Sequence, residues 1–193
     1  PNFITSPLGL VPKKARDQYR IIHDLSFPKG GDSVNSTIPP GSSSVSYELL
    51  DHAIVIIQSI GSGALIAKAD VQAAFRLIPL HPSCYRLTGF TWDSQYYYDM
   101  VLPFGASTSC QTFEQFSTSI HWILQHHFQV PYLSHILDDF MFFGPPGDNT
   151  CSKSLKKFTM LADNLKIPIK HEKTVHPSTR VELHGILVDT IEG

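Results

Sequence analysis

Two adjacent aspartates, Asp138 and Asp139, interrupt the otherwise apolar stretch HILDDFMFFG at residues 135–144. Burying two carboxylates among aliphatic and aromatic side chains is costly unless protons or cations neutralise them. A hard cation such as Mg²⁺ binds one or two carboxylates and leaves its other positions to water and substrate phosphates. The pair therefore points to a metal site for phosphate chemistry, although aspartate is also common in plain turns.

A third carboxylate, Asp70, ends another apolar segment, ALIAKAD at residues 64–70. This segment predicts a buried strand, whereas the residues flanking Asp138 and Asp139 predict a hairpin with the aspartates at its tip. If the strand and the hairpin are neighbours, the three carboxylates can share a pair of metal ions. That arrangement suits in-line displacement at phosphorus.

The composition predicts a globular chain. Its 193 residues, 42% hydrophobic and 17% charged, are enough for one good-sized core or two small lobes. No apolar run approaches the ~20 residues of a membrane-spanning helix, so we expect no membrane association. Three cysteines without paired spacing indicate a reducing, intracellular compartment, in the cytoplasm or the nucleus. The ten histidines are scattered, and we interpret them as ordinary residues rather than metal ligands.

Charge is distributed unevenly along the chain. The formal net charge of −2 argues against nucleic-acid binding when taken as one number. Basic residues nevertheless outnumber acidic ones in residues 1–30 and 153–180, and acidic residues dominate residues 31–152. Folding that brings the two basic regions together around the acidic centre would build a basic groove. Ordinary solvated surface charge is the alternative.

Hydrophobic periodicity and turn residues predict a series of strands and helices. The expected elements are a β-hairpin within residues 6–26, a helix over 47–61, paired strands at 87–92 and 96–102, a helix over 108–128, a third helix over 150–165 capped by Asn149 or Thr150, and strand-like pieces at 167–173 and 180–189. Because strands and helices do not alternate strictly, we predict an α+β fold in which helices back an antiparallel sheet.

Several motifs, in their order and spacing, resemble the palm of reverse transcriptases. They are Asp70 followed by Phe75, LPFG at 102–105, ILDD at 136–139, Lys173, and LHG at 183–185. The opening PKKARDQYRIIHDLS is similar to the fingers hairpin of these enzymes. The segment IHDLSFPKGGDSVN is most similar to retrotransposons of the DIRS-like group, which integrate with a tyrosine recombinase.

The resemblance implies a polymerase right-hand palm with a fingers β-hairpin and no thumb. It further implies a single fingers and palm domain over residues 1–193. The fingers would comprise about 1–60 and 76–100, and the palm about 61–75 and 101–193. Such a chain would be part of a larger polyprotein.

The resemblance also implies a catalytic centre. Asp70, Asp138 and Asp139, with the backbone carbonyl of Val71, would hold two Mg²⁺ ions, for which Mn²⁺ could substitute. Lys173 would protonate the leaving pyrophosphate as a general acid.

A second set of residues would bind the nucleotide and the primer. Phe75 would be the steric gate, because a rigid wall there excludes the 2′-hydroxyl of a ribonucleotide. A plain core aromatic is the alternative. The implied nucleotide-binding residues are Lys13, Arg20, Phe75, Phe104 and Gly105, and the implied primer grip is a hairpin of Leu183, His184 and Gly185. Ile136 and Phe104 depart from the family pattern, at positions where many relatives have Tyr and retroviral enzymes have Gln.

The activity implied is that of an RNA-directed DNA polymerase in retrotransposon replication. It would add deoxynucleotides (dNTP) to a primer 3′-hydroxyl on an RNA or DNA template by two-metal-ion phosphoryl transfer. One alternative is a non-catalytic nucleic-acid-binding remnant of a retroelement. The other is an RNA-dependent RNA polymerase, against which the bulky Phe75 argues.

Overall fold

The computed structural model describes residues 3–13, 17–48 and 50–192, and the chain divides into two compact units. The first unit comprises Pro1–Val45 and Ala74–Phe113, and the second comprises Ser46–Ala73 and Glu114–Gly193. Within the described ranges, no helix is both long and apolar enough to cross a membrane.

The second unit is built on a four-stranded antiparallel sheet with the strand order β6-β7-β3-β8. Its elements are α1 (Leu50–Ile60), β3 (Leu65–Asp70), the part of α2 (Ser109–His126) from Glu114 onward, β6 (Leu133–Ile136), β7 (Asp139–Gly144), α3 (Thr150–Leu165), η5 (His171–Lys173), β8 (Val175–Ser178), β9 (Arg180–Leu183) and β10 (Ile186–Asp189). The central strands β3 and β7 are almost wholly buried, as expected for apolar runs covered on both faces.

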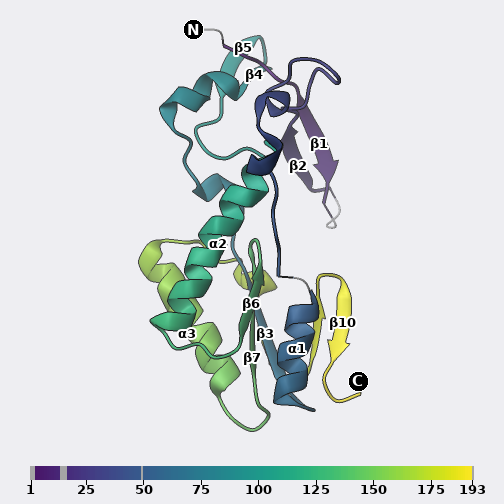
Figure 1. The fold of residues 1–193 in the computed structure, drawn as a ribbon, viewed down its shortest axis with the longest axis vertical. Helices are drawn as coiled ribbons and strands as arrows, with labels where there is room; N and C mark the ends of the chain where they lie inside the picture. Colours follow the sequence, from purple (N-terminus) through teal and green to yellow (C-terminus); the bar gives the residue numbers. More distant parts are fainter. Residues whose placement is uncertain (1–2, 14–16, 49, 193) are drawn as a thin grey trace. The chain divides into compact units, whose positions relative to one another are not determined.

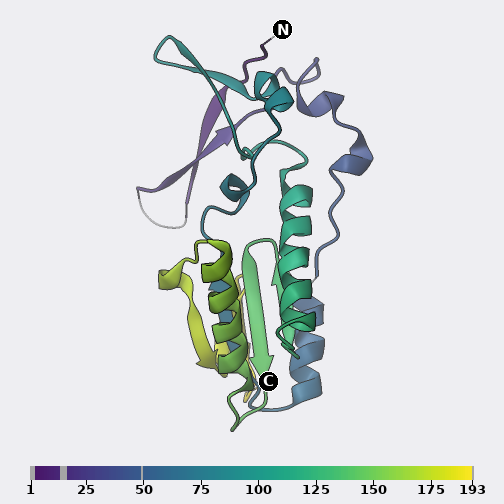
Figure 2. The ribbon, with the colours of Figure 1, turned by 90° about the vertical axis from the view of Figure 1, so that its left-hand side faces the viewer.

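Alternate residues of β7 pack against opposite layers. Phe140 and Phe142 lie with their ring centroids 4.8 and 5.4 Å from that of Phe158 on α3. Phe143 belongs to a buried cluster with Ala53 of α1. Because successive side chains of a strand point to opposite faces, α3 covers one face of the sheet and α1 the other (Figures 1 and 2).

The β9–β10 hairpin lies beside α1 in the second unit (Figure 1). Val181 and Leu183 of β9 are buried in the same cluster as α1. At the edge of the hairpin, the Thr190 hydroxyl donates to the Ala64 carbonyl at 2.8 Å. The hairpin is therefore fixed to the start of β3.

The first unit contains two small hairpins and short 3-10 segments. Its elements are β1 (Leu8–Pro12), β2 (Tyr19–His23), η1 (Asn35–Thr37), η2 (Pro40–Ser42), η3 (Ala74–Leu77), η4 (Pro82–Leu87), β4 (Gly89–Trp92) and β5 (Gln95–Tyr98). Buried His23 joins two of its segments, because Nε2 donates to the Gly89 carbonyl at 2.9 Å. The N–H of the same residue donates to the Phe104 carbonyl at 2.7 Å.

Most predicted elements are confirmed, including the opening hairpin in its described residues, the three helices and the hairpin of the two aspartates. The capping of α3 differs from the prediction. Asn149 occupies the N-cap position but its side chain makes no capping hydrogen bond. Instead, the Asp148 carboxylate accepts from the N–H and the hydroxyl of Thr150 at 2.8 and 2.9 Å.

Four strand predictions are wrong in detail, among them the strand predicted at 96–102, which ends at Tyr98 as β5. Residues 167–173 form a single bridge at Ile169 and the 3-10 turn η5 instead of a strand, because Pro168 cannot donate to a ladder. Residues 180–189 form the hairpin β9–β10 rather than one strand, because His184 and Gly185 both adopt positive φ. Strand β4 begins at Gly89, since η4 occupies the residues before Thr88.

Candidate active site

The strand register places the three predicted acids at one end of the sheet. Asp70, the last residue of β3, pairs with Asp139, the first residue of β7. Ile136 also pairs with Asp139 across the hairpin, so Leu137 and Asp138 form the turn, with Leu137 at φ 51°. The N–H of buried Val71 donates to the Asp138 carbonyl at 2.9 Å. The four residues predicted to bind metal therefore lie together.

Asp138 lies in a strongly anionic environment. Burial raises the pKa of its carboxyl to about 6, and the charges of Asp70 and Asp139 act in the same direction, while Lys173 opposes them. Neighbouring carboxylates raise one another's pKa because two negative charges at short range repel. The cluster thus has an excess of negative charge that a cation can offset.

Three basic groups contact the acids. Lys173 Nζ donates to Asp70 Oδ2 at 3.0 Å, and this hydrogen bond is the largest cause of the raised pKa of Lys173. Lys68 Nζ lies 3.3 Å from Asp139 Oδ1. His184 Nδ1 lies 3.8 Å from Asp139 Oδ2. A raised pKa keeps the Lys173 ammonium protonated near neutral pH.

The acids have the chemistry of a site for a hard cation. Asp139 Oδ1 is buried and accepts no hydrogen bond of good geometry, although Lys68 Nζ is near. Burying a carboxylate oxygen without such a hydrogen bond costs free energy, and the oxygen is available as a metal ligand. In the described ranges, oxygens of Asp70, Asp138 and Asp139 do not all lie within 4.8 Å of one another. All the possible ligand atoms of these three residues are oxygens, which Mg²⁺ prefers.

In the first unit, three predicted nucleotide-binding side chains form a row. The Arg20 guanidinium lies 4.9 Å from the ring centroid of Phe104. The rings of Phe104 and Phe75 have centroids 4.7 Å apart, and Phe75 also meets Phe113 edge-on at 5.8 Å. Phe75 is 9% exposed, so it is also a core aromatic of this unit. Exposed Lys13 follows β1, and its N–H donates to the Gln18 carbonyl at 2.8 Å.

Gly105 of the LPFG turn is required by a close approach within the protein. Its φ is 137°, and a Cβ at this position would overlap the His23 carbonyl oxygen. The side chain of Asn35 holds the turn, because Nδ2 donates to the Gly105 carbonyl at 2.8 Å and Oδ1 accepts from the Ser107 N–H at 2.9 Å. A side chain at Gly105 therefore cannot be accommodated without moving β2.

The predicted primer grip is the end of β9 and the turn that follows it. Leu183 is fully buried in the cluster with α1, so its side chain has a packing role. His184 and Gly185 form the turn, with φ of 49° and 85°. Of the three, His184 is the residue that the structure places beside an acid of the site.

Sequence reasoning missed two residues, Lys68 and Asn35. Lys68 could have been found, because it is an ionisable residue within the apolar segment ALIAKAD. No local signal marks Asn35, since the partners of its side chain, Gly105 and Ser107, are 70 and 72 residues away.

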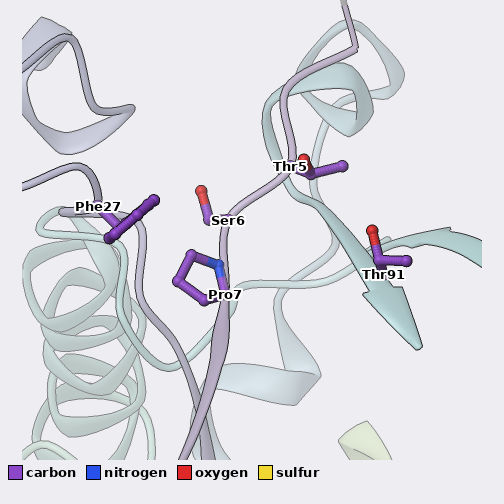
Figure 3. A pocket seen from close by; sticks show the side chains of 5 residues that line it. All are labelled: Thr5, Ser6, Pro7, Phe27 and Thr91. Atoms are coloured by element: carbon purple, nitrogen blue, oxygen red, sulfur yellow. The ribbon is translucent and has the colours of Figure 1, made fainter. Parts of the chain in front are cut away.

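A pocket of about 250 Å³ lies elsewhere, in the first unit. Figure 3 shows its lining side chains, which are Thr5, Ser6, Pro7, Phe27 and Thr91. None of them is a predicted site residue.

Comparison with known families identifies the class of protein. The sequence profile of the family described as reverse transcriptase (RNA-dependent DNA polymerase) matches residues 7–188. The chain therefore belongs to the reverse transcriptase family. A comparison with curated proteins finds no match.

Solved structures of foamy virus enzymes share the fold. The foamy viral protease-reverse transcriptase dRH in complex with double-stranded DNA has a TM-score of 0.77 at 19% identity, over 97% of this chain and 30% of that one. The native prototype foamy virus protease-reverse transcriptase has a TM-score of 0.70 at 22% identity, over 96% of this chain and 23% of that one. The foamy viral enzyme in complex with an RNA/DNA hybrid has a TM-score of 0.70 at 18% identity, over 97% of this chain and 23% of that one.

These comparisons confirm the predicted α+β fold with its reverse transcriptase fingers and palm. The chain spans less than a third of each foamy virus chain that it matches.

Proposed function

We propose that the chain is the fingers and palm core of an RNA-directed DNA polymerase, which extends a primer 3′-hydroxyl with deoxynucleotides. The register that pairs Asp70 with Asp139, beside the turn of Asp138, carries this proposal. It brings acids 68 and 69 residues apart in sequence to one end of a buried sheet, where burial and mutual repulsion favour cation binding.

Reverse transcriptases generally use divalent metal ions. In this chain Asp70, Asp138, Asp139 and the Val71 carbonyl would hold two Mg²⁺ ions, or Mn²⁺ in their place. When bound, such ions stabilise the charge on the attacking and leaving oxygens of an in-line displacement. Asp139 Oδ1, which accepts no hydrogen bond of good geometry although Lys68 Nζ lies 3.3 Å away, supports this assignment.

The other predicted residues would bind and orient substrates. Lys173, held protonated beside Asp70, would donate a proton to the leaving pyrophosphate. Lys13 and Arg20 would bind the triphosphate through charge-assisted hydrogen bonds. Phe75, with its ring fixed against Phe104, would exclude a 2′-hydroxyl.

We also propose that the first unit supplies the fingers and the second unit, including α1, the palm. The turn of Leu183, His184 and Gly185 would grip the primer. The foamy virus structures with double-stranded DNA and with an RNA/DNA hybrid support a template and primer duplex as the partner of this chain. The parent protein would be a polyprotein of a retroelement. The resemblance of the segment at residues 22–35 points to the DIRS-like group.

Primer extension on an RNA template tests the function. Asp138→Asn should lower the rate about a thousandfold, because loss of a metal ligand removes several kcal/mol of charge stabilisation. Asp163→Asn is the matched control, since Asp163 is an exposed acid on α3 of the same unit. Extension by Asp138→Asn at the rate of the unmodified chain would refute the assignment.

Substrate choice separates the alternatives. In a Phe75→Val variant, the ratio of ribonucleotide to deoxynucleotide incorporation should rise at least about tenfold. Circular dichroism checks that the variant is folded. Equal use of both nucleotides by the unmodified chain would favour an RNA polymerase. Tight binding of template and primer without incorporation, in Mg²⁺ or Mn²⁺, would favour a non-catalytic remnant.

A further inference from the structure

A second group of metal-binding residues lies in the second unit, formed by Glu48, His121 and His135. Glu48 precedes α1, His121 lies on α2 and His135 on β6. In the part of the chain that the structure describes, this is the one group of three whose possible ligand atoms all lie within 4.8 Å of one another. Folding thus assembles histidines that appear scattered in the sequence.

The ligand atoms have nearly the spacing of a tetrahedral site. Nδ1 of His121 and Nδ1 of His135 are 2.8 Å apart. Glu48 Oε1 lies 3.9 Å from the first nitrogen, and Glu48 Oε2 lies 4.0 Å from the second. Ligands about 2.1 Å from a tetrahedral Zn²⁺ lie about 3.4 Å from one another. To close the site around an ion, the two nitrogens would move apart by about 0.6 Å and one oxygen of Glu48 would move inward towards both of them.

The carboxylate of Glu48 is held in place by its neighbours. Its Oε2 accepts from the Ser134 hydroxyl at 2.7 Å and from the His135 N–H at 3.1 Å. Hydrogen bonds of this kind orient a ligating carboxylate before the metal arrives.

His135 provides an independent indication of a ligand. The residue is 3% exposed, and its Nε2 is buried with no hydrogen bond of good geometry. That nitrogen lies 3.4 Å from Glu114 Oε1, while Glu114 Oε2 accepts from the Leu137 N–H at 2.9 Å. An imidazole with one nitrogen facing a fixed carboxylate and the other facing two more ligands is the usual arrangement of a metal-bound histidine.

The site opens to solvent on one side. A pocket of about 240 Å³ is lined by the cluster and also by Thr118, Trp122 and Gln125 of α2. A fourth coordination position could therefore be filled by water or by a small ligand.

We propose that Glu48, His121 and His135 bind a Zn²⁺ ion. Two imidazole nitrogens and one carboxylate oxygen form a donor set that suits Zn²⁺ and disfavours Mg²⁺. One of the two Nδ1 atoms carries the proton of their 2.8 Å contact, and that proton must leave or move to the other ring nitrogen when the ion binds. The ion joins the segment before α1 and helix α2 to the strand that leads into the Asp138 turn.

Titration of the metal-free 193-residue chain with Co²⁺, followed by competition with Zn²⁺, tests this site. Tetrahedral Co²⁺ gives intense visible absorption bands, whereas octahedral Co²⁺ bound by aspartates absorbs only weakly. We expect one ion per chain, displaced by Zn²⁺ but not by excess Mg²⁺, and a rise in the midpoint of thermal unfolding with Zn²⁺. Glu114→Gln should weaken binding about 10–100-fold, as loss of a partner of a ligating histidine does.

The ligand variants His121→Gln and Glu48→Gln should weaken binding more than Glu114→Gln. His176→Gln, which changes an exposed side chain on β8 of the same unit, should bind as the unmodified chain does. Asp138→Asn should also retain the bands, which separates this site from the polymerase centre. Equal Co²⁺ affinity in the unmodified chain and in both ligand variants, each folded by circular dichroism, would overturn the proposal.

Discussion

The two units bury their apolar residues to very different extents. In the second unit, Phe142 and Phe143 are 0% exposed, at the centre of a sheet covered by helices. In the first unit, the hairpins leave large side chains in solvent, with Leu10 66%, Trp92 67% and Tyr96 73% exposed. The unit that carries the acids thus has the larger buried core, and the unit that carries the proposed triphosphate contacts has a smaller one.

This difference shows that the two units are stabilised in different ways. Burial of apolar area, at about 25 cal/mol per Å², stabilises the sheet of the second unit. The first unit adds to its smaller apolar core individual polar contacts between distant segments, such as His23 with Gly89 and Asn35 with Gly105. Regions with few buried apolar contacts open at lower free energy, so amide hydrogen exchange should be faster in the first unit.

The largest expected effect is that of Phe143→Ala. Truncating this fully buried ring should lower the free energy of unfolding by about 3–5 kcal/mol, because it leaves a cavity between β7 and α1. Hydrogen exchange measured by mass spectrometry should increase in β3 and β7. Unchanged exchange in both strands would show that the second unit does not depend on this core.

Gly105→Ala should have a smaller but still severe effect in the first unit, about 3 kcal/mol. The new Cβ would overlap the His23 carbonyl oxygen, and φ at this position is 137°. Exchange should increase in β2 and in the residues around Phe104. Gly41→Ala is the control, because a Cβ there meets nothing within 4 Å. Equal stability of the two variants would contradict this reading of the turn.

Asp99→Asn should cost about 1.5–3 kcal/mol, the range for hydrogen bonds to a charged group. Burial opposes ionisation of Asp99, yet the nearby ring of His23 and the hydrogen bond from Arg76 lower the pKa of its carboxyl below the ordinary value. The resulting stabilisation is complete above the unfolded-state pKa of about 3.9 and is lost as the pH falls through the lower folded-state pKa. Urea unfolding between pH 6 and pH 3 should therefore show a weaker pH dependence in the variant. If the free energy of unfolding depends on pH in the same way in the variant and in the unmodified chain, other groups cause the sensitivity to acid.

The smallest effect is expected for Tyr96→Ser on β5. This side chain is 73% exposed, so its loss should change the free energy of unfolding by less than about 0.5 kcal/mol. Urea unfolding gives the value directly. A loss above 1.5 kcal/mol would mean that the exposed aromatics do stabilise the first unit.

Local patterns were sufficient to predict the parts of the fold that carry the acids. The apolar run before Asp70 and the apolar residues around Asp138 and Asp139 predict a strand and a hairpin, and both are present. The register between them could not be predicted from either segment, because pairing of β3 with β7 depends on the whole sheet. That register is what makes the acids neighbours.

Other features lay beyond local patterns for identifiable reasons. Hydrophobic periodicity predicts one strand-like piece at 180–189, because it does not register the left-handed conformation of His184, which few non-glycine residues take; the hairpin at Leu183, His184 and Gly185 was implied by the resemblance alone. The cluster of Glu48, His121 and His135 draws on three separate segments, and no spacing in the sequence marks it. The contacts of Asn35 are similarly long-range.

Lys68 gives the sheet an internal counter-charge. Because side chains two residues apart on a strand share a face, Lys68 and Asp70 project to the same side of β3, where the ammonium meets Asp139. Together with Lys173, it partly balances the acids before any ion arrives. Assembly of this end of the sheet is thereby uncoupled from ion supply, so a chelator should abolish turnover while the polypeptide keeps its native circular dichroism.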